Sequence, residues 1–129
     1  MRKTYEELFG HKEDFKVKYR FYSLEEGGRF NPPYQGIRSD FWYESNDHEK
    51  KGLFMIYPEF EDINGNLIDE DGIVENEGIA RMWILNPNIR PYHQKRIKIG
   101  TVGYFKEGNR STGICEVVDI GGLFENPIF

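Results

Sequence analysis

The sequence predicts a single all-β domain, folded as an antiparallel barrel or sandwich. Six or seven short segments are rich in β-branched and aromatic residues, and Gly, Pro, Asn or Asp separates each from the next. No stretch of ten or more residues carries the 3.6-residue apolar period of an amphipathic helix. With 129 residues, 16% of them aromatic, the chain is long enough for one domain with a core of large side chains.

The first element predicted is a short helix over residues 5–9. Thr4 and Glu7 have the spacing of a capping box, and Gly10 provides a stop. This helix belongs to an N-terminal extension of residues 1–14, which precedes a β domain of residues 15–122 and a tail of residues 123–129.

The first strand is predicted from the alternation in "FKVKYRFY", residues 15–22, which places basic side chains on the outward face. The strands that follow are expected in "IRSDFWYE" (37–44), "LFMIYPEF" (53–60), "IARMWIL" (79–85), "RIKI" running into "TVGYF" (96–105), and "GICEVVDI" (113–120). In the "RIKI" segment we expect Ile97 and Ile99 to point inward.

A hairpin is predicted within "DINGNLIDEDG". The Asp and Asn residues from Asp62 onward resemble the start of a calcium loop, but Leu67 stands where Gly is needed and Ile73 where a bidentate Glu is needed. Asn64–Gly65 instead favours a two-residue type I′ turn. We therefore expect a hairpin here and no metal site.

Charge is distributed unevenly along a chain whose net charge is −5. Residues 53–80 contain no Lys or Arg and eight acids: Glu59, Glu61, Asp62, Asp69, Glu70, Asp71, Glu75 and Glu77. Residues 90–110 contain Glu107 alone against six bases: Arg90, Lys95, Arg96, Lys98, Lys106 and Arg110. The two blocks predict either an acidic and a basic face or, more simply, solvated loops.

The same composition argues against several classes of protein. A single cysteine, Cys115, excludes an internal disulfide and a cysteine zinc cluster, which favours a reducing, cytoplasmic location. No apolar run has the ~20 residues that a membrane-spanning helix needs, and the N-terminal residues show no signal peptide.

Catalytic residues are not evident. Cys115 lies within a predicted strand and is expected to be a packed side chain. His11, His48 and His93 lie in polar loops without metal-ligand spacing and are expected to be exposed. "EEGGRFNPPYQG" lacks the glycine spacing of a phosphate-binding loop. We therefore expect no enzyme activity, no metal and no nucleotide cofactor.

Two segments resemble a known family. "EEGGRFNPPYQGIRSDFWY" resembles the "EGGR-x-x-P-x-x-x-GYRPQFY" signature that opens the C-terminal β-barrel (domain III) of elongation factor Tu. "YFKEGNRSTGICEVVDI" is similar to the "F-x-I-REGGRTVG-x-GVV" segment of the same domain. The resemblance covers residues 15–120 and implies a closed six-stranded antiparallel Greek-key barrel, here with an extra acidic hairpin.

The family's barrel contacts the T-stem backbone of aminoacyl-tRNA and packs against other protein domains. The resemblance implies a corresponding role for Arg29, Arg38, Glu107, Gly108 and Arg110. Asp40 stands where the family has a glutamine that contacts tRNA, and a carboxylate there repels phosphate.

A second basic surface is offered by Arg90, Lys95, Arg96 and Lys98, whose alternative role is a solvated loop beside a strand. The sequence thus predicts a binding module for a protein or structured RNA in a translation-related setting. The alternative is an immunity or antitoxin protein, whose eight acids cover a basic toxin or nuclease surface.

Overall fold

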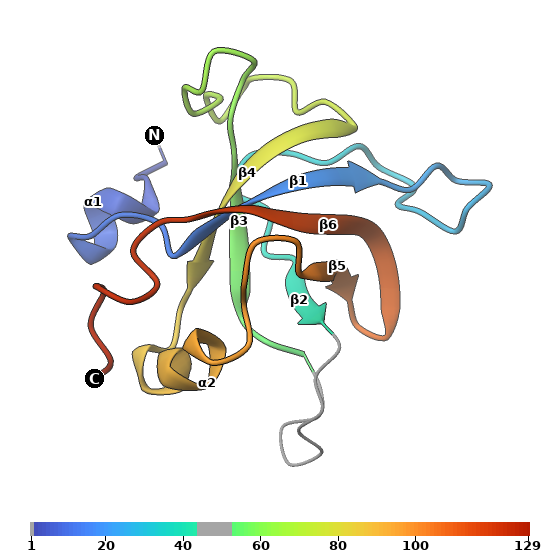
Figure 1. Ribbon diagram of the computed structural model, residues 1–129. Helices are drawn as coiled ribbons and strands as arrows, with labels where there is room; N and C mark the ends of the chain where they lie inside the picture. Colours follow the sequence, from blue (N-terminus) through green and yellow to red (C-terminus); the bar gives the residue numbers. More distant parts are fainter. Residues whose placement is uncertain (1, 44–52) are drawn as a thin grey trace.

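The computed structural model describes residues 2–43 and 53–129, which form a mostly antiparallel β structure (Figure 1). One six-stranded sheet has the order β2-β5-β6-β1-β4-β3. Its strands are β1 (Phe15–Phe21), β2 (Asp40–Tyr43), β3 (Ile56–Phe60), β4 (Glu77–Ile84), β5 (Val102–Glu107) and β6 (Arg110–Ile120). All five pairings between neighbouring strands are antiparallel, which confirms the predicted strand type.

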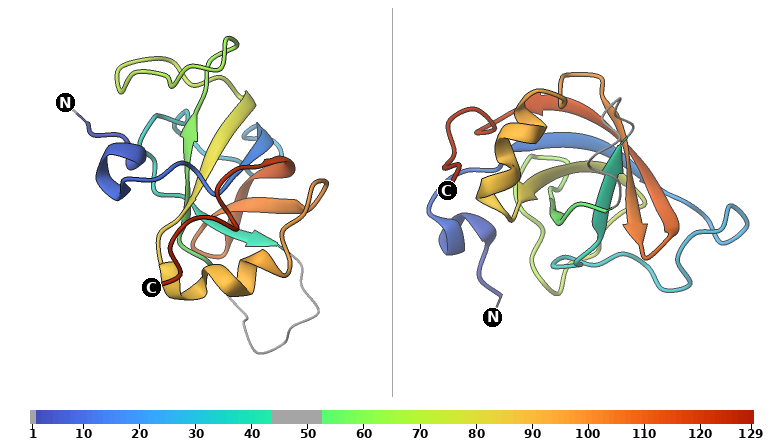
Figure 2. Two further views of the ribbon diagram at one scale, coloured as in Figure 1. Left: turned by 60° about the vertical axis from the view of Figure 1, so that its left-hand side comes forward. Right: turned by 90° about the horizontal axis from the view of Figure 1, so that it is seen from below.

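The predicted closed barrel is wrong, because the sheet is a curled half-barrel with two edges. The sheet curls until β2 comes back towards β3, as the right-hand view of Figure 2 shows. Within residues 2–43 and 53–129 the two edges meet at one bridge, where Phe41 and Phe54 exchange hydrogen bonds of 2.9 Å. β2, of four residues, pairs along its length with β5 and not with β3.

The edge of β3 is capped by a side chain. The Gln35 amide accepts a hydrogen bond from Phe60 N at 2.8 Å and donates one to Phe60 O at 2.9 Å. Its nitrogen also donates to Ile68 O at 2.8 Å. Gln35, which is buried, therefore occupies the edge groups that a closing strand would need.

The core lies inside the curl and is mainly aromatic. The alternation predicted for β1 is confirmed, since Phe15, Val17, Tyr19 and Phe21 are all buried. Tyr19 packs edge-to-face on Phe60, with ring centroids 5.1 Å apart. Contacts of this kind specify ring orientation in addition to burying apolar area.

The predicted N-terminal helix is confirmed as α1 (Tyr5–Phe9). The Thr4 hydroxyl accepts a hydrogen bond from Glu7 N, and the Glu7 carboxylate accepts one from Thr4 N, both at 3.1 Å. Gly10 ends the helix with φ 74°, a conformation that costs glycine little. Among the described residues, no helix has the length and apolar character needed to cross a membrane.

The predicted strand "RIKI" is wrong. After the 3-10 turn η1 (Pro87–Ile89), the chain forms a second short helix, α2 (Arg90–Gln94), and then a series of turns. The Asn86 side chain accepts a hydrogen bond from Asn88 N, and proline occupies the first turn of both helical segments, where its missing N–H costs nothing. Ile97 is buried as expected, but Ile99 is 63% exposed.

The predicted hairpin is confirmed, but its turn is not type I′. Glu61 and Leu67 form an antiparallel bridge. A type I′ turn needs positive φ at both central residues, and only Gly65 has it, at 85°. Asp62 accounts for the difference, because its carboxylate accepts hydrogen bonds from Asn64 N at 2.8 Å and Asn66 N at 3.0 Å.

Replacing Gly103 with alanine is expected to destabilise the sheet by about 1–3 kcal/mol, the usual cost of overpacking a core. Gly103 lies in β5, and a Cβ atom there would sit 2.2 Å from Cζ of Phe41. Urea unfolding measures the change. The double variant Gly103→Ala/Phe41→Leu, which shortens the obstructing ring, should lose less than the sum of the single variants. Strict additivity would show that the two residues do not clash.

Candidate functional site: an acidic groove

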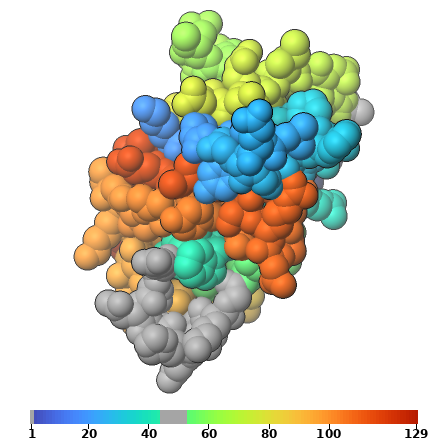
Figure 3. Space-filling model, turned by 90° about the vertical axis from the view of Figure 1, so that its right-hand side faces the viewer, coloured from blue at the N-terminus to red at the C-terminus, as the bar shows by residue number. Residues whose placement is uncertain are grey.

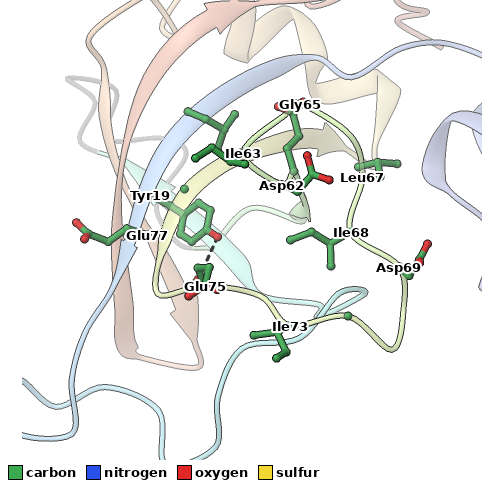
Figure 4. Close-up of a pocket in the computed structure, with 14 residues that line it drawn as sticks. Tyr19, Asp62, Ile63, Gly65, Leu67, Ile68, Asp69, Ile73, Glu75 and Glu77 are labelled. Carbon is green, nitrogen blue, oxygen red and sulfur yellow. Dashed lines mark hydrogen bonds between the residues drawn. The ribbon is translucent and has the colours of Figure 1, made fainter.

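A large groove lies under the loop between β3 and β4. The hairpin and the loop that follows leave the sheet at the top of Figure 1 and fold back beside β4 and β1. The space they enclose, about 900 Å³, is shown in Figure 4. We call it the acidic groove; its lining includes Tyr19, Asp62, Ile63, Ile68, Asp69, Ile73, Glu75, Glu77 and Ile79.

Apolar side chains stand unusually exposed at this groove. Ile63 is 100% exposed and Ile73 is 82% exposed, and Figure 4 shows them at different ends of the loop with Ile68 between them. Single exposed apolar residues are common on protein surfaces, but several around one concavity are typical of a binding site. The groove can therefore take apolar side chains.

Carboxylates surround these isoleucines. Asp62, Asp69, Glu75 and Glu77 are exposed, and Figure 4 shows the Asp69 and Glu77 side chains on opposite sides of the groove. No lysine or arginine is found among the residues that line it. Walls of one charge sign concentrate the field within a concave surface, so the groove attracts cationic ligands.

Two of the eight predicted interface acids are paired with basic residues of the chain itself. Glu59 is fully buried, and its Oε2 atom pairs with Nη2 of Arg2 at 2.6 Å. Glu61 pairs with Lys16 at 2.9 Å and with Arg81 at 2.8 Å. As part of an open acidic face, the prediction for Glu59 and Glu61 is therefore wrong, because arginine or lysine neutralises each. Asp71 is exposed nearby, and Glu70 accepts a 2.8 Å hydrogen bond from Arg2 N.

Tyr19 fixes the loop over the groove. Its hydroxyl donates a 3.1 Å hydrogen bond to Glu75 O, drawn as the dashed line in Figure 4. Burial raises the pKa of this phenol, and the nearby Glu75 carboxylate raises it further, so the donor proton is retained. Together with the 2.7 Å hydrogen bond that Phe21 N donates to Asn76 O, this contact joins the loop to β1.

The two glycine-arginine segments singled out in the sequence, residues 25–43 and 104–120, meet at the tip of the β5–β6 hairpin. Arg110 donates to Gly27 O at 2.9 Å and to Gly28 O, and Arg29 pairs with Glu107. Figure 3 shows the blue segment after β1 against the orange β5–β6 segment on this face. These arginines bind the protein's own carbonyl and carboxylate groups, while Gly108 lies exposed at the turn.

Asp40 lies beside this cluster at the start of β2, and Arg38 precedes the strand and lies near Tyr5. Arg38 is exposed, whereas Asp40 is half-buried opposite Lys106 in the strand register. Burial raises the pKa of the Asp40 carboxyl. The structure therefore brings Arg29, Glu107 and Arg110 together, with Asp40 on the adjoining strand and Arg38 outside the cluster.

Of the four bases predicted to form a second basic surface, Lys95 and Lys98 are the two that are exposed. Arg90 is only 1% exposed and pairs with buried Asp14, so its prediction as a ligand-binding residue is wrong. The Arg96 guanidinium stacks 3.7 Å from the Tyr92 ring centroid and donates to Tyr92 O at 2.7 Å. Lys95 and Lys98 are exposed beside α2, at the opposite end of the molecule from the acidic loop (Figure 1).

The histidines and the cysteine differ in part from expectation. His93 is fully buried rather than exposed, and its Nδ1 lies 2.7 Å from the Tyr43 hydroxyl. Burial, with Arg96 and Arg90 nearby, lowers the pKa of His93 to about 4. Cys115 is buried as predicted, and burial raises the pKa of its thiol well above the usual value. His48 lies outside the described residues.

Residues 2–43 and 53–129 contain no cluster of three His, Cys, Asp or Glu side chains that could hold a metal ion.

Sequence reasoning found the acids of the groove but missed its isoleucines and Tyr19. The sequence did contain one indication of the isoleucines, because Ile63 and Ile73 lie in polar loop sequence where no strand requires an apolar residue.

Comparison of the sequence with models of known protein families and with curated proteins finds no match.

Proposed function

We propose that this protein is a non-catalytic binding module. Its acidic groove binds a segment of a partner protein that carries both basic and apolar side chains. One observation carries the proposal: an open concave surface of about 900 Å³ combines exposed isoleucines with carboxylates and no basic lining residue. Cationic side chains of the partner would pair with Asp69, Glu75 and Glu77, and apolar side chains would pack on Ile63 and Ile73. Electrostatic steering of this kind mainly raises the association rate.

RNA is the less favoured partner class. Of the residues first assigned to it, Arg90 is buried, Arg96 stacks on Tyr92, and Arg29 and Arg110 bind Glu107 and two backbone carbonyls. The exposed Lys95 and Lys98, with Arg38 outside that segment, would give a weak, salt-sensitive contact with a phosphate backbone.

The cellular setting of this binding module is part of the proposal. The resemblance of both glycine-arginine segments to domain III of elongation factor Tu supports a translation-related role. The acidic groove equally supports an inhibitor that covers the basic surface of a toxin or nuclease. The identity of the partner separates the two settings.

Reversing three groove charges is expected to slow association with a basic partner about 10- to 100-fold at low salt, because steering is lost. The variant is Asp69→Lys/Glu75→Lys/Glu77→Lys, three exposed groove acids. Its control, Glu6→Lys/Glu25→Lys/Asp119→Lys, changes the net charge equally at exposed positions outside the groove. Wild type and both variants are immobilised and exposed to a lysate, with and without RNase. Proteins captured by the wild type are then purified, and stopped-flow kinetics measure their rate of association with each of the three chains.

The expected result is a basic protein retained by the wild type and the control, lost by the groove variant, and unaffected by RNase. Equal capture and equal rates for all three chains would overturn the proposal. A ligand that RNase removes, and that Lys95→Glu/Lys98→Glu abolishes while the groove variant keeps it, would assign the protein to RNA instead.

A further inference from the structure

A segment of the chain itself covers part of the outer face of β3 and β4. We call residues 2–11 the strap; it contains α1, which stands outside the sheet in both views of Figure 2. Among the described residues, three buried side-chain polar atoms have no hydrogen-bond partner: Oε1 of Glu59, Nε1 of Trp83 and Nε2 of His93. The first two belong to residues that the strap contacts directly.

The polar half of the strap contact is centred on Glu59. Its Oε2 atom accepts from Nη2 of Arg2 at 2.6 Å and from Tyr5 N at 3.0 Å. Its Oε1 atom is buried without a partner. Arg2 thus bonds only one oxygen of the Glu59 carboxylate and leaves the other without a partner. Arginine pairs best with a carboxylate through two parallel hydrogen bonds, one to each oxygen.

The apolar half is a group of three rings that contact Trp83 in tilted arrangements. The rings of Tyr5, Phe9 and His11 lie with centroids 5.8 Å, 6.0 Å and 5.9 Å from that of Trp83. Yet α1 is only five residues long and contains no buried residue, and its Leu8 side chain is 55% exposed. A helix of this length is not stable by itself, so a few side-chain contacts hold the strap in place.

The strap site is continuous with the acidic groove. A second groove of about 620 Å³ lies between the strap and the acidic loop, lined by Arg2, Thr4, Glu7, Leu67, Ile68, Asp69, Glu70, Asp71 and Gly72. Asp69 and Ile68 line both grooves. A partner segment that extends from the acidic groove past Asp69 enters the second groove, whose lining includes Arg2, the residue that pairs with Glu59.

We propose that the strap site is an arginine-binding site for the partner and that the strap is its built-in competitor. The inference rests on the proposed function, and it specifies the partner chemistry as an arginine with an aromatic residue close by, as Arg2 and Tyr5 stand in the strap. The incoming guanidinium pairs with both oxygens of Glu59, and the aromatic ring replaces Tyr5 on Trp83. Arginine is required over lysine, because an ammonium group cannot form the two parallel bonds.

The test uses a synthetic peptide with the sequence of residues 2–11 and the full chain carrying Arg2→Ala/Tyr5→Ala. A Trp42→Phe background leaves Trp83 as the sole tryptophan for fluorescence titration. The weakened chain should bind the peptide at least about tenfold more tightly than wild type, whose own strap competes at high effective concentration. A peptide with lysine in place of the arginine should bind the weakened chain about tenfold more weakly.

Two controls keep the result interpretable. Lys3→Ala changes an exposed strap residue and should leave the wild-type response unchanged. Should the double variant not fold by circular dichroism, Arg2→Ala alone replaces it, and hydrogen exchange at Tyr5–Phe9 of wild type is followed as peptide is added. Peptide binding that is absent from the weakened chain, or equal in wild type and weakened chain, overturns the inference, as does unchanged exchange at Tyr5–Phe9.

The two proposals fail in different ways. If the groove variant loses a basic partner whose affinity the strap variants leave unchanged, the binding function stands and the strap inference is wrong. If the strap peptide binds the weakened chain but no basic partner depends on the groove acids, the strap inference stands and the proposed function is wrong.

Discussion

Asp14→Asn is expected to lower the free energy of unfolding by about 3–5 kcal/mol, the usual cost of leaving one member of a buried ion pair uncompensated. Asp14 is fully buried, Arg90 is 1% exposed, and Nε of Arg90 lies 2.7 Å from Oδ1 of Asp14. Because small domains have a total stability of about 5–15 kcal/mol, this one change removes a large part of it.

The size of the effect follows from the number of segments that meet at this pair. The Asp14 carboxylate also accepts from Ile84 N at 2.8 Å and from Nδ2 of Asn126 at 2.9 Å. Arg90 donates to Ile84 O at 3.1 Å and to Pro127 O. The start of β1, the end of β4, α2 and the C-terminal residues are thereby joined around one carboxylate.

Urea unfolding of five chains measures this prediction: wild type, Asp14→Asn, Arg90→Met, the double variant Asp14→Asn/Arg90→Met, and Glu125→Ala as a control. Glu125→Ala breaks the exposed Lys12–Glu125 pair, whose side chains are 52% and 73% exposed, and should change stability little. The double variant Asp14→Asn/Arg90→Met removes both charges and should be more stable than Asp14→Asn alone. A double variant that is less stable by the sum of both single changes would show that the buried charge is not the cause.

Acidification from pH 6.5 to pH 4 is expected to destabilise the protein by about 3 kcal/mol through His93 alone. Burial lowers the pKa of His93 from 6.5 to about 4 in the folded state. The unfolded chain therefore binds this proton first as the pH falls. The contribution is complete above the unfolded pKa and is lost as the pH drops towards the folded one.

The variant His93→Asn separates this contribution from that of the carboxylates. Asparagine keeps a polar atom for the Tyr43 hydroxyl, which lies 2.7 Å from Nδ1 of His93, but it cannot be protonated. Its unfolding free energy should fall less steeply between pH 6.5 and pH 4, by up to about 1.4 kcal/mol per pH unit. Parallel curves for both chains, or an imidazole NMR titration near pH 6.5, would contradict the assignment.

Local patterns predicted much of the fold because they act over short distances. The alternation of Phe15, Val17 and Tyr19 places them inward whatever the neighbouring strand, and the capping box of Thr4 closes within one helical turn. The same logic located the acidic loop and its hairpin. It failed where two local signals conflicted, as at residues 96–99, where apolar alternation follows a proline-initiated helix.

The remaining features depend on contacts between residues far apart in sequence. Asp14 and Arg90 are separated by 76 positions, and Arg2 and Glu59 by 57. Nothing in the local sequence indicates that Arg90 faces inward or that Glu59 is covered by the strap. A charged side chain is expected at the surface, and only its partner makes burial tolerable.

The Gln35 cap on β3 has a consequence for how any partner can bind. A half-barrel sheet has two edges, and an exposed edge ordinarily invites β-augmentation, in which a foreign chain adds as a further strand. Here the amide of Gln35 already occupies Phe60 N and O, and Phe54 occupies the corresponding groups of Phe41. Recognition at these positions must proceed through side chains, so the affinity for a partner should follow its charge pattern and the salt concentration rather than its β propensity.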